Sequence, residues 1–388
     1  MDPKIRRVAA VLAAALLFAF SALTLPAGAA QGGDASGLAL DCVSAILMEA
    51  QTGRVLYEKN ADEALPPASV TKIMTLLLVM EAMERGVIGL DTVLTTSTHA
   101  SKMGGSQIYL KEGEQMRAED LIKSVVIASA NDAAVVLAEA VAGSEEAFVA
   151  QMNRRAAELG MKTAHFENTN GLDDTVSDHV LSARDIAIMS RELIKHKKIL
   201  EYSSTWMDSV RGGAFGLTNT NRLIRFYRGA TGLKTGSTSK AKFCMSATAE
   251  RDGMSLIAVI MAAPTRDARN SAAAALLDWG FANYSIYKYD AGDDAELPVK
   301  GGVVNTLHTA HGEFCAVVKR GDEKKVKAER SLPENVSAPI KEGDVVGGID
   351  FMLGDEALGK IPITAAHEVE KISFGGLFGR MLRRFFLI

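Results

Sequence analysis

The sequence is poor in cysteine, which limits how the chain can be stabilised. Its 388 residues include three cysteines, Cys42, Cys244 and Cys315, and these lie far apart along the chain. Secreted domains that depend on disulfides carry many closely spaced cysteines, so a disulfide scaffold is excluded. An odd count leaves room for one bridge at most, and we expect none.

The sequence also lacks clustered metal-ligand residues and an excess of positive charge, and these absences argue against metal ions and nucleic acid as partners. The seven histidines are scattered, and no cluster of histidine or cysteine has the spacing of metal ligands. We therefore expect no metal and no other cofactor. The formal net charge is −4, so the chain lacks the basic excess that attracts proteins to nucleic acid. Nucleic acid is not an expected partner.

The longest apolar run lies at the N-terminus. Three basic residues within the first seven precede an uncharged run over 8–25, and Ala27-Gly28-Ala29 offers small residues for cleavage. This pattern predicts a secretory signal peptide over residues 1–29. Because the run is long, an uncleaved single-span anchor is the alternative. In both cases we expect an exported protein at the outer face of the cytoplasmic membrane or in the cell wall, on the periplasmic side.

The rest of the chain is long enough for two domains, and its pattern changes near residue 290. Over residues 30–285, apolar residues at helical spacing alternate with strand-like runs, which predicts an α/β (α+β) domain with helices flanking an antiparallel sheet. Over residues 290–368, short β-type runs alternate with charged turns, which predicts a small all-β domain of the β-sandwich kind.

The antiparallel sheet is predicted from several apolar runs. Residues 44–57 have the pattern of a hairpin, and Asp252-Gly253 between two apolar runs indicates a second one. Lys234-Thr235-Gly236 falls near the end of a strand of this sheet. The lysine offers positive charge, the threonine a hydroxyl, and the glycine close approach of another backbone. This combination suits an anionic, extended substrate added along a sheet edge.

Ser69 and Lys72 form a candidate catalytic pair. Two prolines precede Ser69, and apolar residues then recur at helical spacing, so both side chains should lie on one face of a first helical turn. A serine hydroxyl needs an adjacent base to act as a nucleophile. A lysine can be that base when burial or neighbouring cations lower its pKa. Taken alone, such a pair is more often an N-cap serine with a solvated lysine, and only the motifs further along the chain favour the catalytic interpretation.

Ser129 and Asn131 form a second candidate pair. They lie on a short connection between predicted helices over 119–128 and 132–141. Buried polar groups need partners, and a cleft holding a lysine and a substrate amide would supply them. The alternative is that Asn131 only caps the second helix. Upstream, residues 87–110 are predicted to be irregular, and the paired glycines within 103–107 permit unusual backbone angles.

Together the three motifs carry a resemblance. Ser69-x-x-Lys72, Ser129-x-Asn131 and Lys234-Thr235-Gly236 stand in the order and approximate spacing of the penicillin-recognising serine enzymes, the transferase and β-lactamase-like group. Within that group the chain resembles the low-molecular-weight penicillin-binding proteins that are D-alanyl-D-alanine carboxypeptidases. Further likeness lies in Met103–Gln107, Asn170–Leu172, Ala268–Asn270 and the layout beyond residue 285. Ser237 departs from the pattern, because these enzymes often carry a bulkier residue there.

The resemblance implies a reaction on peptidoglycan stem pentapeptides. Ser69 would attack the carbonyl between two D-alanines, Lys72 would accept its proton, and Ser129 would pass that proton to the leaving D-alanine. Water would release the acyl-enzyme, whereas β-lactam antibiotics would acylate the same serine and leave slowly. The implied substrate contacts are Asn131 for the amide, the N–H groups of Ser69 and Ser237 for the oxyanion, and Lys234, Thr235, Gly236 and Arg269 around the terminal carboxylate.

Three other functions share these motifs. A class A β-lactamase needs a glutamate that activates the deacylating water, and Glu167, ahead of Asn170, lacks the expected spacing and context. A non-catalytic wall-binding scaffold could dispense with catalytic residues, yet all are present. A transpeptidase would use an amine instead of water as acceptor, which the sequence leaves open. For the C-terminal domain, the resemblance implies a spacer or partner-binding role.

The last segment, 372–388, is predicted to be an amphipathic helix. Arg380, Arg383 and Arg384 lie on one half of the helical wheel, and the other half is apolar, with Phe374, Leu377, Phe378, Met381, Leu382, Phe385, Phe386 and Ile388. Apolar bulk opposite arginines suits a helix lying in an anionic membrane surface. The segment is too short and too charged to span a bilayer. The alternative is that this helix packs back on the protein.

Overall fold

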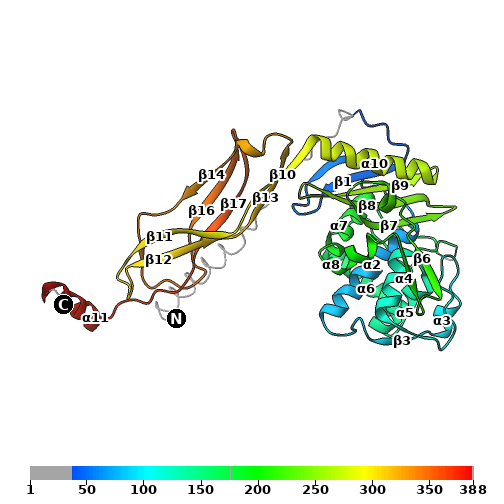
Figure 1. The fold of residues 1–388 in the computed structure, drawn as a ribbon, viewed down its shortest axis with the longest axis horizontal. Coiled ribbons are helices and arrows are strands. Elements are labelled where there is room, and N and C mark those ends of the chain that lie inside the picture. Colours follow the sequence, from blue (N-terminus) through cyan, green and yellow to red (C-terminus); the bar gives the residue numbers. More distant parts are fainter. Residues whose placement is uncertain (1–36, 175, 387–388) are drawn as a thin grey trace, which may run out of the picture. The chain divides into compact units, whose positions relative to one another are not determined.

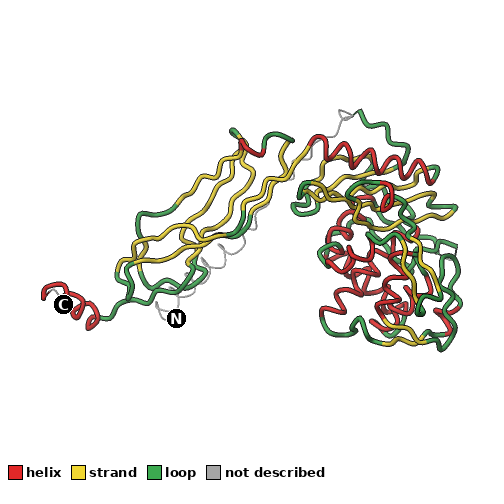
Figure 2. Tube along the Cα trace, in the orientation of Figure 1, coloured by secondary structure: helices red, strands yellow, loops and turns green. Residues whose placement is uncertain are grey.

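The computed structural model describes residues 37–174 and 176–386, so the predicted signal peptide lies outside the described residues. Helices are concentrated before residue 284 and strands dominate after it (Figure 2). The elements of the first part are β1 (Ser44–Glu49), β2 (Val55–Lys59), the 3-10 turn η1 (Ala68–Thr71), α2 (Lys72–Glu84), β3 (Val93–Thr95), α3 (Thr98–Ser101), β4 (Gln115–Arg117), α4 (Ala118–Ile127), α5 (Asn131–Ala142), α6 (Glu145–Glu158), α7 (Ala183–Leu193), α8 (Lys197–Ser203), β5 (Met207–Val210), β6 (Phe215–Thr218), α9 (Leu223–Phe226), β7 (Ala230–Thr238), β8 (Lys242–Arg251), β9 (Met254–Ala263) and α10 (Arg266–Asn283).

A five-stranded antiparallel sheet organises this part, in the order β2-β1-β9-β8-β7. Both predicted hairpins are present, and Asp252 and Gly253 form the turn between β8 and β9, where both residues have positive φ. Because β7 is the last strand in this order, one of its edges is left for another backbone. The strand that carries Lys234-Thr235-Gly236 is therefore an edge strand.

Alternation along the strands divides the core into two layers. On β1, Ile46 and Met48 pack with α2, α4, α5 and α7, whereas Ala45 and Leu47 pack with α10. Successive side chains of a strand point to opposite faces, so a run buried on both sides needs helices on both sides. Figure 1 shows α10 over one face of the sheet and α2, α4, α5 and α7 beneath the other. The predicted mixed fold is confirmed.

One predicted segment needs correction, and one helix start bears on a predicted site residue. Residues 87–110 are not wholly irregular, because they contain β3 and α3, two elements too short to show a period. Helix α10 begins at Arg266, because the Thr265 hydroxyl accepts the N–H of Ala268 and caps the helix there. Arg269 consequently lies within a helix.

After residue 283 the chain is almost entirely β. The elements are β10 (Tyr284–Tyr289), β11 (Gly292–Lys300), β12 (Thr306–His311), β13 (Phe314–Lys319), η2 (Glu323–Lys325), β14 (Val326–Ser331), β15 (Val336–Ser337), β16 (Val345–Leu353), β17 (Glu356–Ala365) and finally α11 (Phe374–Phe386). They form a two-stranded sheet, β10-β13, and a six-stranded sheet, β14-β16-β17-β12-β11-β15. All three cysteines are free. Within the described ranges, no helix combines the length and apolar character needed to cross a membrane.

Candidate active site

The candidate nucleophile lies in a tight turn before a buried helix. Ser69 is in η1 and only partly buried, and α2 begins at Lys72, whose side chain is fully buried. The Lys72 Nζ is 2.9 Å from the Ser69 Oγ and 2.8 Å from the backbone oxygen of Asn170. These distances are those of hydrogen bonds. The structure thus brings the predicted pair into direct contact.

Burial controls the charge of Lys72. Loss of solvent disfavours the ammonium form, so the pKa of Lys72 lies well below its usual value. The positive charge of Lys234 lowers it further, and the Asp132 carboxylate acts in the opposite direction. A neutral amine at this position can accept the proton of a neighbouring hydroxyl.

The connection between α4 and α5 supplies the second pair. Ser129 has a positive φ of 63° and places its Oγ 2.9 Å from the Lys234 Nζ. Asn131 donates its Nδ2–H to the oxygen of Gly104 at 2.7 Å, and its N–H bonds to the oxygen of Ser106. The Asn131 Oδ1 is buried and accepts no hydrogen bond from any residue in the described ranges. Asn131 is not the helix cap, because Ala130 occupies the cap position and Asn131 is the first residue of α5.

Edge strand β7 lies directly against the nucleophile turn. A Cβ at Gly236 would approach the oxygen of Pro67 and the N–H nitrogen of Ser69, each to 2.8 Å, which leaves room for glycine alone. On the same strand Lys234 and Thr235 are buried, and Ser237 is exposed. The three motifs therefore meet at one place, as their spacing predicted.

The charge of Lys234 is also tuned by burial. Its pKa falls to about 7, mainly because the ammonium is desolvated and secondly because Arg269 carries a like charge nearby. Its Nζ donates to the Thr235 oxygen as well as to Ser129. An incoming carboxylate would favour the charged form and raise this pKa.

The hydrogen bonds of the Arg269 side chain go to residues outside the predicted set. Its guanidinium is buried and donates to the Asn270 Oδ1, and more distantly, at 3.5 Å, to the oxygen of Cys244. Cys244 is the β8 residue paired with Gly236. Arg269 therefore affects the site by lowering the pKa of Lys234 through its positive charge. Its guanidinium hydrogen bonds are to protein groups.

Some residues of the site escape sequence reasoning. The Asn170 oxygen holds Lys72, and Thr220 Oγ1 accepts the hydroxyl of Thr235 at 2.8 Å. His179 lies 2.8 Å from the hydroxyl of Thr71, inside the nucleophile turn. The only signal was the Asn170-Gly171-Leu172 likeness, which does not reveal that a backbone oxygen is the contact. The Glu167 carboxylate accepts the N–H of Asp178 at 2.8 Å.

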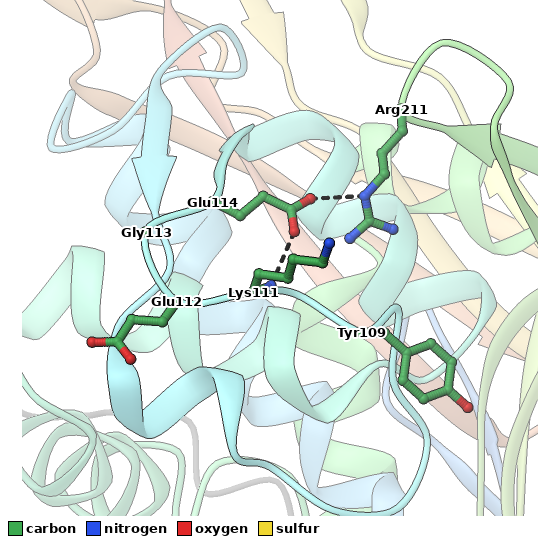
Figure 3. Close-up of a pocket in the computed structure, with 6 residues that line it drawn as sticks. All are labelled: Tyr109, Lys111, Glu112, Gly113, Glu114 and Arg211. Carbon is green, nitrogen blue, oxygen red and sulfur yellow. Dashed lines mark hydrogen bonds and ion pairs between the residues drawn. The ribbon is translucent and has the colours of Figure 1, made fainter.

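A separate pocket lies between the 109–114 loop and the β5–β6 hairpin (Figure 3). Its volume is about 470 Å³, and it is lined by Tyr109, Lys111, Glu112, Gly113, Glu114 and Arg211. Arg211 and Glu114 form an ion pair at 2.7 Å. The lining contains none of the predicted catalytic residues, and much of its charge is neutralised internally, so we assign no role to it.

Comparison with known proteins gives two family matches. Residues 31–265 match the D-alanyl-D-alanine carboxypeptidase model of peptidase family S11, and residues 289–371 match the C-terminal domain of penicillin-binding protein 5. The carboxypeptidase DacF of Bacillus subtilis is 42% identical over 347 residues, covering 87% of this chain and 88% of that protein.

Solved structures agree with these matches. Penicillin-binding protein 5 of Haemophilus influenzae superposes with a TM-score of 0.75 at 28% identity, covering 86% of this chain and 99% of that one. Penicillin-binding protein D2 of Listeria monocytogenes, solved with ampicillin bound, has a TM-score of 0.58 at 32% identity, covering 63% of this chain and 98% of that one.

Proposed function

The chain belongs to the D-alanyl-D-alanine carboxypeptidase family, whose members are penicillin-binding serine peptidases of peptidoglycan metabolism, and we propose that Ser69 is its nucleophile and Lys72 the base. One observation carries this assignment: a fully buried Lys72 amine, with a depressed pKa, lies 2.9 Å from the Ser69 hydroxyl. Attack forms the bond from Ser69 Oγ to the carbonyl carbon, while the hydroxyl proton moves to Lys72.

Breakdown of the tetrahedral intermediate needs a proton at the leaving amine. Ser129 is proposed to relay it: its hydroxyl, which accepts a hydrogen bond from the Lys234 Nζ at 2.9 Å, donates its own proton to the amine and takes back from Lys72 the proton that Ser69 gave up. The bond from carbon to nitrogen breaks, D-alanine departs with that proton, and Ser69 keeps the acyl group. Water then attacks the ester and restores the free serine.

Edge strand β7 is the proposed substrate platform. An extended peptide can add to the free edge, with its terminal carboxylate at Lys234 and the Thr235 hydroxyl. The unpartnered Asn131 Oδ1 is suited to accept the substrate amide N–H. Backbone N–H groups of Ser69 and Ser237 are proposed as the oxyanion donors, each worth about 3–4 kcal/mol in comparable acyl transfer. The stem pentapeptide of peptidoglycan is the proposed substrate.

β-Lactam binding follows from the same geometry. A penicillin carries a carboxylate and a reactive amide, so it would occupy the Lys234 position and acylate Ser69. The ampicillin-bound relative supports this expectation. Because the leaving group stays tethered to the acyl group, water is hindered and the adduct persists.

We further propose that, after export directed by residues 1–29, α11 attaches the protein to the outer face of the cytoplasmic membrane. The helix exposes apolar side chains of Phe374, Leu377, Phe378, Met381, Leu382 and Phe385. Such a face can lie in a membrane interface without spanning it. Arg380 instead bonds to Asn305 and Val303 in the β domain, so one residue of the polar face is engaged by protein.

The experiment that tests the activity measures D-alanine release from a pentapeptide ending in D-Ala-D-Ala. A matched peptide ending in D-Ala-L-Ala is the control for stereochemistry, and a peptide with an amidated C-terminus tests the carboxylate contact. Hydrolysis of the controls would release L-alanine or D-alanine amide, so cleavage of the last peptide bond is followed for all three, and we expect it in the first peptide only. Equal hydrolysis of all three would contradict the proposed role of Lys234 and Thr235.

A further inference from the structure

The residue before the nucleophile has an unfavourable backbone conformation. Ala68 has φ of +47°, in the left-handed region that residues with a Cβ rarely adopt. Such a conformation persists only where the surrounding contacts enforce it. One of these contacts is the Thr71 hydroxyl, which donates to the Ala68 oxygen at 2.8 Å. The orientation of Ser69 thus depends on this oxygen being held.

Thr71 is itself held by a buried histidine. The His179 Nδ1 accepts the N–H of Glu167 at 3.1 Å, so the ring proton is on Nε2 and is donated to Thr71 Oγ1 at 2.8 Å. Phe166 packs edge-on against the ring at 5.7 Å. His179 is 5% exposed, which leaves the ring little freedom to reorient. A chain of three hydrogen bonds therefore runs from Glu167 to Ala68.

The segments that carry this chain also hold the base. From the 166–171 segment, the oxygens of Thr169 and Asn170 accept Thr75 Oγ1 at 2.6 Å and Lys72 Nζ at 2.8 Å. Gly171 lies so close that a Cβ there would meet the Ala68 oxygen at 1.9 Å. The 166–171 segment holds Lys72, and the turn at Ala68 holds Ser69. His179 therefore links this segment to this turn.

We propose that His179 is a positioning residue for acylation, acting through Thr71 to hold the Ala68 turn and hence the Ser69 hydroxyl against Lys72. This inference rests on the proposed function, in which Ser69 is the nucleophile. This role requires the His179 ring to be neutral, because a second ring proton, on Nδ1, would point at the Glu167 N–H and break that hydrogen bond. Burial supplies that condition by lowering the pKa of His179 to about 4, with His165 acting in the same direction and Glu167 and Asp173 in the opposite one.

Matched substitutions can distinguish an effect on the position of Ser69 from an effect on the stability of the fold. His179→Phe keeps the ring against Phe166 and removes both hydrogen bonds, whereas His179→Gln keeps an amide donor within reach of Thr71. Thr71→Val removes the hydroxyl at constant size, and Thr71→Ser restores it. For each, labelled penicillin gives the dissociation constant of the reversible complex and the rate constant of acylation, and melting temperature reports folding.

We expect His179→Phe and Thr71→Val to lower the acylation rate constant about tenfold or more, with reversible binding nearly unchanged, since sub-ångström misplacement of a nucleophile slows the chemical step. Thr71→Ser should recover most of the rate, and the double variant should be no slower than either single one. Variants that melt earlier but, when folded, acylate at the wild-type rate would overturn the proposal. Absence of any label on the wild-type Ser69 would instead refute the proposed function.

Discussion

Replacement of Gly236 by alanine tests the contact on which the site is built. Its Cβ would lie 2.8 Å from the Pro67 oxygen and the Ser69 nitrogen, and 3.0 Å from the Val70 nitrogen. All three are backbone atoms, so no flexible side chain can yield. Ordinary van der Waals contact between a Cβ and these atoms begins at 3.4 Å, and the added Cβ would lie at 2.8 Å. Strand β7 must therefore move away from the Ser69 turn by about 0.6 Å.

That movement should affect chemistry more than folding. Overpacking of this kind costs about 1–3 kcal/mol of stability. A shift approaching 1 Å between reacting groups can slow a reaction about a hundredfold, so we expect Gly236→Ala to reduce penicillin acylation about tenfold to a hundredfold. Gly216→Ala is the matched control, because Gly216 is also a strand glycine without a positive φ and its Cβ would meet nothing within 4 Å.

The assay is the second-order rate constant for labelling by a fluorescent penicillin, measured on protein shown to be folded by thermal melting. The control variant should match the wild type in both measurements. If Gly236→Ala acylates at the wild-type rate, the packing of β7 on the nucleophile turn does not position the reacting groups, and the account of the site is wrong.

Two further predictions concern charge. Lys72→Arg should abolish acylation because arginine cannot act as a base near neutral pH, whereas Lys234→Arg keeps the positive charge and should retain measurable activity. In the wild type, kcat/KM should fall as pH rises above about 7, where free Lys234 loses its proton, and this decline should vanish in Lys234→Arg. A third concerns the tail. Deleting residues 372–388 should release the protein from anionic vesicles without changing peptide hydrolysis, and added salt should weaken binding of the intact form; vesicle binding by the truncated form would contradict this role.

The three motifs could be predicted from the sequence because each is local. Ser69 and Lys72 are one helical turn apart, and Lys234-Thr235-Gly236 lies in a strand-like run just ahead of the hairpin marked by Asp252-Gly253. Local patterns specify which side chains share a face, and the order of the three motifs indicated the family. The expected mixed fold with a β-rich C-terminal part is confirmed for the same reason.

Other parts of the site depend on contacts between distant segments. The Asn170 oxygen reaches Lys72 across 98 residues, and His179 reaches Thr71 across 108. A contact made by a backbone oxygen leaves no signature in the sequence. His179 is one of seven scattered histidines, and nothing in its sequence neighbourhood indicates that it is buried beside Thr71. The conformation of Ala68 was equally unforeseeable, because alanine does not favour positive φ and tertiary contacts impose it.

The most direct test of the central claim is the site of covalent attachment. The intact protein is incubated with penicillin and digested, and the peptide bearing the adduct is identified by mass spectrometry. We predict a single adduct on Ser69, absent from a Ser69→Ala variant that has the wild-type melting temperature. An adduct that persists in Ser69→Ala, or one found on Ser129 in the wild type, would contradict the assignment of Ser69 as the nucleophile.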